Sequence, residues 1–317
     1  MRTASVIVPT CRGGFRLERL LASLEPSRYQ VLVVDNGVGL GGRLRGVEVV
    51  QLERNEGFAR AVNSGARRAE GDAIVLVNDD CICDPGFVDE LAGALDPSAG
   101  VVMAAGVLRR WNEERCIESA GMEIDGTLLV WEYLHGEPLD VLAGEVEEPI
   151  GPSAAAAAFD REAFLAAGGF DERLFAYWED VDLVLRLRRQ GGRCALAKRA
   201  QGVHEHAATL GSGSAAKNYL MGFGRGYVLR KWGAASWRRL PAILARDAAI
   251  CLGQAVVDRN VAGVRGRIEG YRAAQLVPRF SYPGELLAGH AVSGVFTSLR
   301  RRARRRAWPR PHTGSAA

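Results

Sequence analysis

The stretch Ala73-Ile-Val-Leu-Val77, followed directly by Asn78-Asp79-Asp80, decides the fold class. Two similar apolar runs precede it, Ser5-Val-Ile-Val-Pro9 and Val31-Leu-Val-Val34, and a third candidate strand covers Val47–Leu52. Short β-branched runs that alternate with helical patterns are typical of parallel strands covered by helices on both faces. The sequence therefore predicts an α/β domain with a mostly parallel sheet, and all four strands are expected to be buried on both faces.

Helical patterns separate these runs and continue after them. Apolar residues three and four apart predict helices after Gly14, from Phe58 to Ala69 and from Pro85-Gly86 to Leu95. Two more are expected, one beginning at Arg161 and one from Glu179 to Gln190. In the first helix, the residues expected to share one apolar side are Phe15, Leu17, Leu20, Leu21 and Leu24.

The middle of the chain has a different pattern. Val101–Leu108 and Met122–Tyr133 are strand-like, and the turn residues Asp125-Gly126 predict an antiparallel hairpin. The five-alanine run Ala154–Ala158 fits either a helix or a tightly packed strand. Cys194–Ala197 is interpreted as a further strand.

From Ser214 the pattern is helical, over Ala215–Lys231, Trp237–Val257 and Val261–Gln275. We therefore expect three parts: an α/β domain over residues 1–213, a helical region over 214–298, and an Arg-rich tail over 299–317 that is expected to be disordered. No transmembrane span is expected, because every apolar run is interrupted before the ~20 residues that a bilayer requires.

The charge distribution is uneven. The 317-residue chain carries a net charge of +4, but its last 19 residues contain seven arginines and no acid, so the net charge without them is −3. The basic charge is thus a terminal patch, whereas a nucleic-acid-binding fold would line a groove with it. Ordinary proportions of hydrophobic (48%) and charged (25%) residues indicate a globular protein.

The six cysteines are scattered, and the apolar run Ser5–Pro9 is too short for the core of a signal peptide. Reduced thiols in the cytoplasm are the interpretation that fits. Cys81-Ile-Cys83 lacks a second pair at zinc spacing, so both cysteines are interpreted as small apolar residues.

A glycine-rich segment raises the question of a dinucleotide site. Gly37, Gly39 and Gly42 match G-x-G-x-x-G. That motif binds a pyrophosphate only where a helix begins at it. Here the next strand is expected at Val47, so the segment is interpreted as a flexible loop.

Polar residues follow the predicted strands where parallel strands form a ligand crevice. Carboxylates at Asn78-Asp79-Asp80 can hold a hard cation that bridges the oxygens of a diphosphate; the alternative is a solvated strand end with Asp79 capping a turn. Asp35 and Asn36 end the second run on the same edge, where an Asp can accept from a base or ribose. The nearby Arg54–Phe58 adds amides, or supplies a helix cap at Asn55.

Two later motifs could complete a site. Tyr177-Trp-Glu-Asp-Val-Asp-Leu183 begins a helix, whose dipole alone favours acids at its first turn. Trp178 and Tyr177 beside those acids also suit a sugar platform with a general base. His204-Glu-His206 follows the strand at Cys194, and one imidazole there could join Asp80 in a metal site.

Taken in order, these motifs resemble glycosyltransferase family 2, in its bacterial rhamnosyltransferase-like branch, over roughly residues 3 to 232. The motifs are Ser5-Val-Ile-Val-Pro-Thr10, Val33-Val-Asp-Asn-Gly37, Arg54-Asn-Glu-Gly-Phe58 with Asn63-Ser-Gly65, Asn78-Asp79-Asp80, Gly168-Gly-Phe-Asp-Glu172 and Trp178-Glu-Asp-Val-Asp-Leu183. The resemblance implies a GT-A fold, with a mostly parallel sheet flanked by helices and a C-terminal helical extension, and inversion at the anomeric carbon.

The resemblance also implies roles for individual residues. Asp80 would be the metal ligand, Asp180 the catalytic base and His204 a further metal or diphosphate contact. The residues expected to bind the donor nucleotide are Pro9, Thr10, Arg12, Asp35, Asn63, Asn78 and Asp79, and those expected to bind the acceptor are Trp178 and Glu179. Two departures matter: Asn78 stands where many relatives have Asp, so it is expected to bind ribose, and Ala154–Ala158 replaces larger apolar residues near the acceptor.

The expected enzyme is an inverting, Mg²⁺- or Mn²⁺-dependent hexosyltransferase in cell-surface glycan biosynthesis. Its donor would be dTDP-rhamnose or a UDP-sugar. Its acceptor would carry a free hydroxyl, and a lipid-linked acceptor is one alternative. The C-terminal helices and Arg tail would then hold the cytoplasmic protein to the inner face of the membrane. A nucleotidyltransferase and a non-catalytic nucleotide-sugar-binding protein remain alternatives, and the released product separates them: nucleoside diphosphate, pyrophosphate or none.

Overall fold

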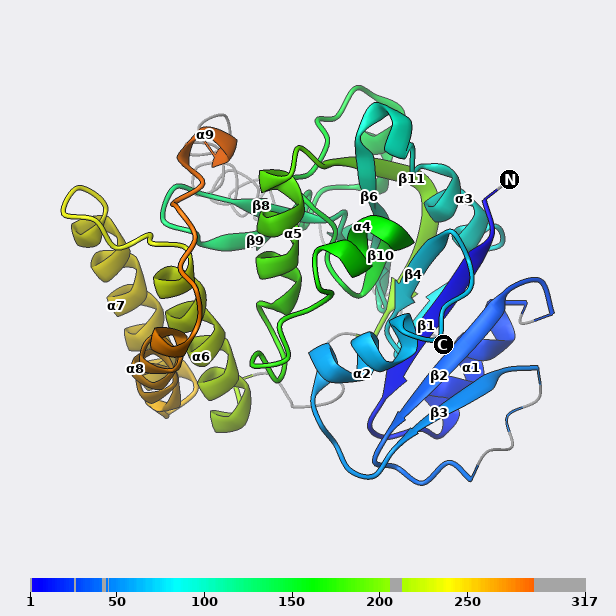
Figure 1. The fold of residues 1–317 in the computed structure, drawn as a ribbon, viewed down its shortest axis with the longest axis horizontal. Helices are drawn as coiled ribbons and strands as arrows, with labels where there is room; N and C mark the ends of the chain where they lie inside the picture. The colour runs from blue at the N-terminus through cyan, green and yellow to red at the C-terminus, as the bar shows by residue number, and fades with distance from the viewer. Residues whose placement is uncertain (1, 26, 42–43, 45, 206–212, 288–317) are drawn as a thin grey trace, which may run out of the picture.

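The computed structural model describes residues 2–25, 27–41, 44, 46–205 and 213–287. A single mixed sheet forms the body, helices cover both of its faces, and the C-terminal helices gather at the end far from β3 (Figure 1). The predicted α/β class with a C-terminal helical extension is confirmed. The tail expected over 299–317 lies outside the described residues.

The strand order of the sheet is β3-β2-β1-β4-β10-β6-β11-β5, with β7 beside β6. The first four strands in that order are parallel, as predicted, but β10 is antiparallel to both of its neighbours, so the whole sheet is mixed. The strands are β1 (Ala4–Thr10), β2 (Gln30–Asn36), β3 (Glu48–Leu52), β4 (Ala73–Val77), β5 (Cys81–Cys83), β6 (Val101–Arg110), β7 (Glu113–Ser119), β10 (Ala156–Asp160) and β11 (Arg193–His204).

Alternation along the central strands gives the sheet two buried faces. Val6 and Val8 pack with α1 and α3 on one face, whereas Ile7 packs with α2, α4 and α5 on the other. The helices are α1 (Phe15–Ser23), α2 (Phe58–Ala66), α3 (Phe87–Gly93), α4 (Arg161–Ala166) and α5 (Glu179–Arg189), with short 3-10 turns at Pro97–Ala99, Leu139–Ala143 and Ala274–Leu276.

Two packing expectations were wrong. β3 is an edge strand that pairs only with β2; its residues Glu48 and Gln51 are exposed, and only Val50 is fully buried. Phe15, the first residue of α1, is 70% exposed, while Leu17 and Leu20 are buried as predicted.

The middle segment forms the expected hairpin of β8 (Met122–Ile124) and β9 (Val130–Glu132), which is antiparallel. The Asp125 carboxylate holds its turn by accepting hydrogen bonds from the amides of Thr127 (2.7 Å) and Leu129 (3.0 Å). The alanine run is a strand from Ala156 onward, paired on both sides, so the small side chains lie in the middle of the sheet.

The C-terminal helices are α6 (Ala215–Lys231), α7 (Leu240–Val257), α8 (Ala262–Ala273) and the short α9 (Gly284–Leu287). α6 and α8 touch through their backbones, because a Cβ added at Gly226 or Gly270 would collide with the carbonyl oxygen of the facing helix. α6 also joins the main core. Tyr227 and Trp232 are fully buried there, so the boundary near residue 213 does not separate two cores.

The expectation that no segment is long and apolar enough to cross a membrane was wrong for α7. By length and composition this 18-residue helix qualifies, with a mean hydropathy of 1.5. Its two charged residues, however, pair with protein groups: Arg246 with Asp125, and Asp247 with Arg225 at 3.1 Å. In this structure α7 therefore lies against the protein.

Candidate active site

A cleft of about 840 Å³ opens where the carboxyl ends of β1, β2 and β4 meet the N-terminal end of α5, and the hairpin and the helices α6 and α7 complete its wall. Parallel strands place their carboxyl ends at one edge of a sheet, which is where ligands bind in such folds. The predicted site residues that line it are Pro9, Thr10, Asn78, Asp79, Asp80, Trp178, Glu179, Asp180 and His204.

His204 and Asp80 meet at one end of the cleft. His204 ends β11 and Asp80 lies just past β4, and the two side chains approach with Nε2 3.1 Å from Oδ1. The other ring nitrogen, Nδ1, lies 2.8 Å from Oε1 of Glu118 on β7. All three side chains are about nine-tenths buried.

This cluster has the chemistry of a cation site. Burial opposes protonation of His204, but the two carboxylates outweigh it and raise its pKa to about 10. Asp80 Oδ1 is buried and accepts no hydrogen bond of good geometry among the described residues. A divalent cation would satisfy that oxygen and replace the proton on Nε2, and imidazole nitrogen with carboxylate oxygen is a suitable donor set. The residues present thus fit a metal held by Asp80 and His204.

Cys81 lies beside them, with its sulfur within 4.8 Å of the other two ligand atoms. Burial raises the pKa of this thiol well above its ordinary value. A neutral thiol is a poor ligand for Mg²⁺ or Mn²⁺, so we interpret Cys81 as packing. All six cysteines are free.

Thr10 connects the first strand to the acidic triplet. Its hydroxyl donates to Oδ2 of Asp79 at 2.5 Å and accepts from the amide of Gly13 at 2.9 Å. Burial, with the nearby charge of Asp80, raises the pKa of Asp79 although the Thr10 bond opposes it. Asp79 is therefore a positioned acceptor, while Asp80 faces the histidine. Asn78 lies in the same wall, and its backbone N–H donates a hydrogen bond to the carbonyl oxygen of Ala155 at 3.3 Å.

Asp180 lies in the first turn of α5. Its carboxylate accepts from the amides of Val181 (2.8 Å) and Ala154 (3.3 Å), which fixes its orientation. Burial raises its pKa, and burial together with Asp180 raises the pKa of Glu179 further. The backbone hydrogen bonds to the Asp180 carboxylate favour its ionised form, so Asp180 is the better placed proton acceptor of the two.

The backbone before α5 is held in an uncommon conformation. Tyr177 and Trp178 have φ values of 69° and 75°, a left-handed region that bulky side chains rarely adopt. Such residues persist where the surrounding structure fixes them, and they gather at functional sites. Here the turn directs Glu179 and Asp180 into the cleft.

Three predicted nucleotide contacts do not line the cleft. The buried Asp35 carboxylate accepts from the amides of Val38 (2.7 Å) and Leu40 (2.6 Å), so it closes its own loop. Asn63 is tied to the backbone of Phe170, with its Nδ2 donating at 2.9 Å. Arg12 lies on the exposed side of the loop. The side chains of Asp35 and Asn63 are therefore occupied by hydrogen bonds that hold the local structure. From β2, the residue that lines the cleft is Asn36.

Trp178 also differs from the expected sugar platform. It is only 7% exposed, and its ring packs against Gly224 on α6, with the Arg225 guanidinium 5.7 Å from the ring centroid. Little of its face is open for stacking. Tyr177, which is half-buried and lines the same cleft, has more accessible surface.

The structure adds three charged residues that the sequence patterns did not indicate. Glu118 orients His204. Glu132, on β9, lines the cleft and accepts a hydrogen bond from Ser119. Partial desolvation by the cleft wall, with the nearby charges of Asp180 and Glu118, raises its pKa to about 7, although the residue is exposed to solvent. Lys217, half-buried in the first turn of α6, lies 5.8 Å from the Tyr177 ring and has no ion-pair partner among the described residues. None belongs to a recognisable local motif.

His206 of the predicted His204-Glu-His206 motif lies outside the described residues, and Glu205 pairs with Arg16 at 2.9 Å. The Gly37 segment leads from β2 into β3 with no helix among its described residues, so the helix that a dinucleotide motif requires is not seen in that part of the segment.

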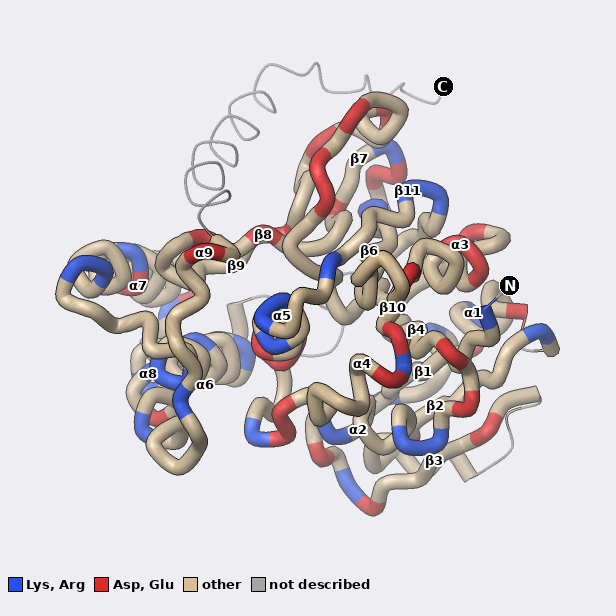
Figure 2. Tube along the Cα trace, turned by 45° about the horizontal axis from the view of Figure 1, so that its top comes forward, with Lys and Arg blue, Asp and Glu red and all other residues tan. Residues whose placement is uncertain are grey.

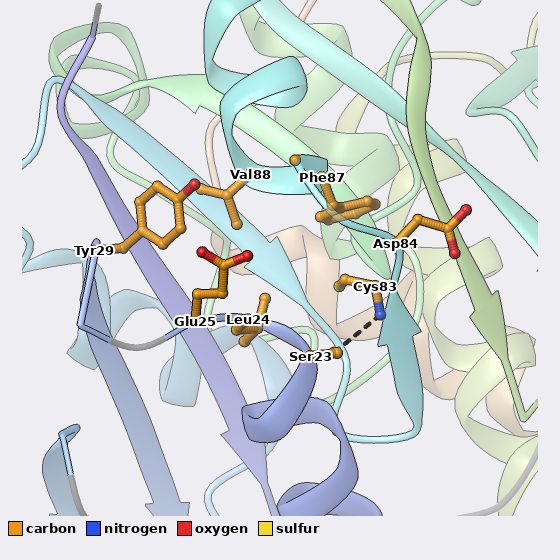
Figure 3. A pocket seen from close by; sticks show the side chains of 9 residues that line it. Ser23, Leu24, Glu25, Tyr29, Cys83, Asp84, Phe87 and Val88 are labelled. Atoms are coloured by element: carbon orange, nitrogen blue, oxygen red, sulfur yellow. Dashed lines mark hydrogen bonds between the residues drawn. The ribbon is translucent and has the colours of Figure 1, made fainter.

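A second, far smaller cavity lies between α1 and α3 (Figure 3). Its volume is about 10 Å³, and beside it the amide of Cys83 donates to the Ser23 hydroxyl at 3.1 Å. A space of that size holds at most about one water molecule. We therefore assign it no ligand.

Known proteins are similar to this chain in sequence and in fold. The family model described as "Glycosyl transferase family 2" matches residues 5–164, half of the chain. The N-acetylglucosaminyl-diphospho-decaprenol L-rhamnosyltransferase of Mycobacterium tuberculosis is 31% identical over 239 residues, which cover 65% of this chain and 77% of that protein.

Other relatives are longer than this chain. The pre-mycofactocin glycosyltransferase of Mycobacterium tuberculosis is 28% identical, with 66% of this chain and 44% of that protein covered. The O-antigen biosynthesis protein RfbC of Myxococcus xanthus is 27% identical, with 61% of this chain covered. The chain matches only 16% of RfbC.

Solved structures confirm the predicted GT-A type of fold. GalNAc-T7, crystallised with UDP, GalNAc and Mn²⁺, superposes with a TM-score of 0.62 at 15% identity, covering 94% of this chain and 58% of that one. The mannosyltransferase PcManGT from Pyrobaculum calidifontis, with GDP-Man and Mn²⁺, gives 0.51 at 20% identity, covering 95% and 82%. At these identities the likeness concerns the fold.

Proposed function

Because the chain belongs to glycosyl transferase family 2 and is thus a glycosyltransferase, we propose that it transfers a sugar, with inversion, from a nucleotide-diphosphate donor to an acceptor hydroxyl in cell-surface glycan synthesis. One observation carries the proposal. The cation-type pair of Asp80 and His204 and the positioned carboxylate of Asp180 line the same cleft. An inverting transfer requires both, one to bind the leaving diphosphate and one to accept a proton.

Donor binding would use the carboxyl edge of the sheet. Asn55, whose Oδ1 accepts a 3.0 Å hydrogen bond from Asn36, would offer its side-chain NH2 group to the nucleoside, and Thr10 and Asn78 line the wall next to it. A divalent cation held by Asp80 and His204 would supply positive charge to the diphosphate. Lys217, an ammonium group without a carboxylate partner among the described residues, offers a second positive charge in the same cleft. Neither Asp35 nor Asn63 needs to touch the donor in this arrangement.

Asp180 would be the base. Its raised pKa makes it a stronger proton acceptor than an ordinary aspartate, which favours deprotonation of a hydroxyl in the transition state. The acceptor O–H bond breaks with its proton moving to Asp180, the oxygen bonds to the anomeric carbon, and the bond from that carbon to the diphosphate oxygen breaks. Glu179, whose pKa is raised by burial and by Asp180, would donate a hydrogen bond to the acceptor in its protonated form.

The relatives support a narrower version of the proposal. One of them is named as a rhamnosyltransferase that acts on a diphospho-decaprenol, so dTDP-rhamnose is the first donor to test, with a UDP-sugar second. A lipid-linked acceptor would place a cytoplasmic enzyme at the inner face of the membrane. Its basic C-terminal part suits that location.

The test is a panel of nucleotide sugars, with Mg²⁺, Mn²⁺ or chelator, read first by thermal shift and then by product analysis. Donor binding that depends on the cation should raise the unfolding temperature by mass action. Release of nucleoside diphosphate with transfer of the sugar is the expected result. Release of pyrophosphate would indicate a nucleotidyltransferase, and tight binding without any product would indicate a binding protein. Either outcome contradicts the proposal.

A further inference from the structure

The solvent-facing side of α7 is apolar, which is the reverse of the usual arrangement in a surface helix. Its exposed positions recur at intervals of three and four, and none of them is charged: Pro241, Ala242, Leu244, Ala245, Ala248, Ala249, Leu252, Gly253, Val256 and Val257. Four of these, Leu244, Leu252, Val256 and Val257, are 57 to 77% exposed. A surface helix ordinarily directs such a stripe toward the core and its charges toward water.

The polar residues of α7 face the protein instead. Arg246 pairs with Asp125 of the hairpin, and Asp247 pairs with Arg225 at 3.1 Å and with Arg267 at 3.4 Å. Further along, Gln254 donates to Asn218 on α6 at 3.2 Å. These ion pairs and hydrogen bonds fix the rotation of α7, so its apolar side points outward because its polar side is occupied.

The part of the chain that contains α7 is basic in composition. Residues 214–287 contain 12 Lys and Arg against 4 Asp and Glu, a net charge of +8, whereas residues 1–213 contain 22 against 33, a net charge of −11. The mild overall charge conceals this asymmetry. Lys and Arg recur on α6, α7 and α8 (Figure 2).

Residues at the two ends of α7 have the character of a membrane interface. Trp237, 79% exposed, precedes the helix and stacks under the Arg238 guanidinium at 5.0 Å. The exposed Arg259 and Val261 follow it. Trp and Arg at the margins of an apolar stripe are typical of helices that lie in the headgroup region of a bilayer.

We propose that α7 docks the protein onto an anionic lipid bilayer, lying parallel to the surface with Leu244, Leu252 and Val256 inserted and the exposed Arg238 and Arg259 at its two ends facing lipid phosphates. A second copy of the chain fits this surface less well, because two regions of charge +8 would repel each other across an α7–α7 contact. The inward ion pairs of Arg246 and Asp247 oppose a spanning orientation.

The docking would bring the cleft close to the membrane surface, because α7 forms part of the cleft wall. Ile250, Gln254 and Asp258, on the inward side of the same helix, line the cleft that contains Asp180. An acceptor on a lipid carrier would therefore enter beside the helix that lies in the bilayer. This consequence rests on the proposed function, whereas the docking itself does not.

The experiment measures partition of the full chain onto phosphatidylcholine vesicles with and without phosphatidylglycerol. The variant Leu252→Gln/Val256→Gln removes apolar surface without changing charge. Phe15→Gln is the matched control, because Phe15 is equally exposed but lies on α1. We expect the double variant to lose about tenfold or more in partition onto anionic vesicles, since each aliphatic side chain inserted contributes a large transfer free energy. The control should bind like wild type.

Two salt concentrations separate insertion from electrostatic attraction. Between about 0.1 M and 1 M salt, screening shortens from ~10 Å to ~3 Å, so the electrostatic part falls while the loss caused by the double variant should persist. Equal partition of wild type and double variant, or no binding by either, would overturn the proposal. A wild type that forms dimers in sedimentation velocity, with a monomeric double variant and unchanged vesicle binding, would assign the face to a second copy.

Sugar transfer to a soluble acceptor is measured in parallel. Leu252 and Val256 do not line the cleft, so this activity should be unchanged in the double variant. An enzyme that transfers sugar but does not dock would contradict the docking alone. One that docks but transfers nothing would contradict the proposed function alone.

Discussion

Nε2 of His204 lies 3.1 Å from Oδ1 of Asp80, which joins the end of β11 to the residues that follow β4. With Glu118 on the other ring nitrogen, two carboxylates surround one imidazole. That excess of negative charge requires either a proton on the ring or a cation beside it. The geometry therefore couples the binding of a cation to the loss of a proton from His204.

Replacing Asp80 tests this coupling. We expect Asp80→Ala to abolish the part of nucleoside diphosphate affinity that depends on Mn²⁺, because an imidazole alone is a weak site for a hard cation. Calorimetry with and without Mn²⁺ measures it. Asp89→Asn, which removes a surface carboxylate paired with Arg28 at 2.8 Å, is the control and should bind like wild type. Unchanged cation-dependent affinity in Asp80→Ala would eliminate this role.

The second prediction concerns the base. Asp180→Asn should retain the donor affinity of wild type and lose at least ~10²-fold in turnover, the range that general bases contribute. The side-chain oxygen of the new asparagine can still accept the hydrogen bond from the backbone N–H of Val181, so the first turn of α5 should remain folded. Isothermal calorimetry and single-turnover rates measure the two quantities. If donor affinity falls in proportion to the rate, Asp180 contributes to donor binding or to folding and does not act as the base.

The raised pKa of Glu132, about 7, predicts a pH dependence of stability. Partial desolvation in the cleft and the charges of Asp180 and Glu118 disfavour its ionised form in the folded protein, so the folded state binds more protons than the unfolded chain between the ordinary pKa of Glu and about 7. Because Glu132 is exposed, solvent screening keeps the effect small. Stability should therefore fall as pH rises through that interval. Glu132→Gln should be more stable than wild type at pH about 8, and the difference should disappear near pH about 4. Thermal unfolding measured across this range would contradict the assignment if the difference stayed constant.

The α6–α8 contact gives a prediction about packing. Gly270→Ala should lower the free energy of unfolding by about 1–3 kcal/mol, because the added methyl group meets the Phe223 carbonyl and the helices must separate. Gly253→Ala, on the open side of α7 where nothing lies near the added group, should be neutral or stabilising by up to ~1 kcal/mol. Urea unfolding of both variants compares them. Equal effects would mean that helix propensity, and not close contact, controls the region.

The tail gives the last prediction. Deleting residues 299–317 removes seven arginines, each of which contributes about 1 kcal/mol near an anionic surface at moderate salt. Vesicle binding should weaken at low salt and approach that of the full chain at high salt, where the apolar side of α7 would sustain it. Activity on a soluble acceptor should not change. Equal sedimentation of both proteins at low salt would show that the tail does not contribute.

Local patterns were sufficient for much of the fold. The β-branched runs, the alternating helices and the Asp125-Gly126 turn predicted strands, helices and hairpin in their observed positions. They did not reveal that β10 runs antiparallel between β4 and β6, or that β3 is an edge. Strand order depends on contacts between residues far apart in the sequence, and such contacts leave little local pattern.

The candidate site divides in the same way. The sequence by itself predicted that Asp80, Asp180 and His204 would belong to one site, because each follows a strand or begins a helix, and the three side chains line one cleft. Only the tertiary structure decided that Asp35 and Asn63 bond to their own surroundings, and that Glu118, Glu132 and Lys217 join the cleft. The physical reason is that a side chain's type limits which bonds it can form. Which partner it meets depends on how distant segments pack.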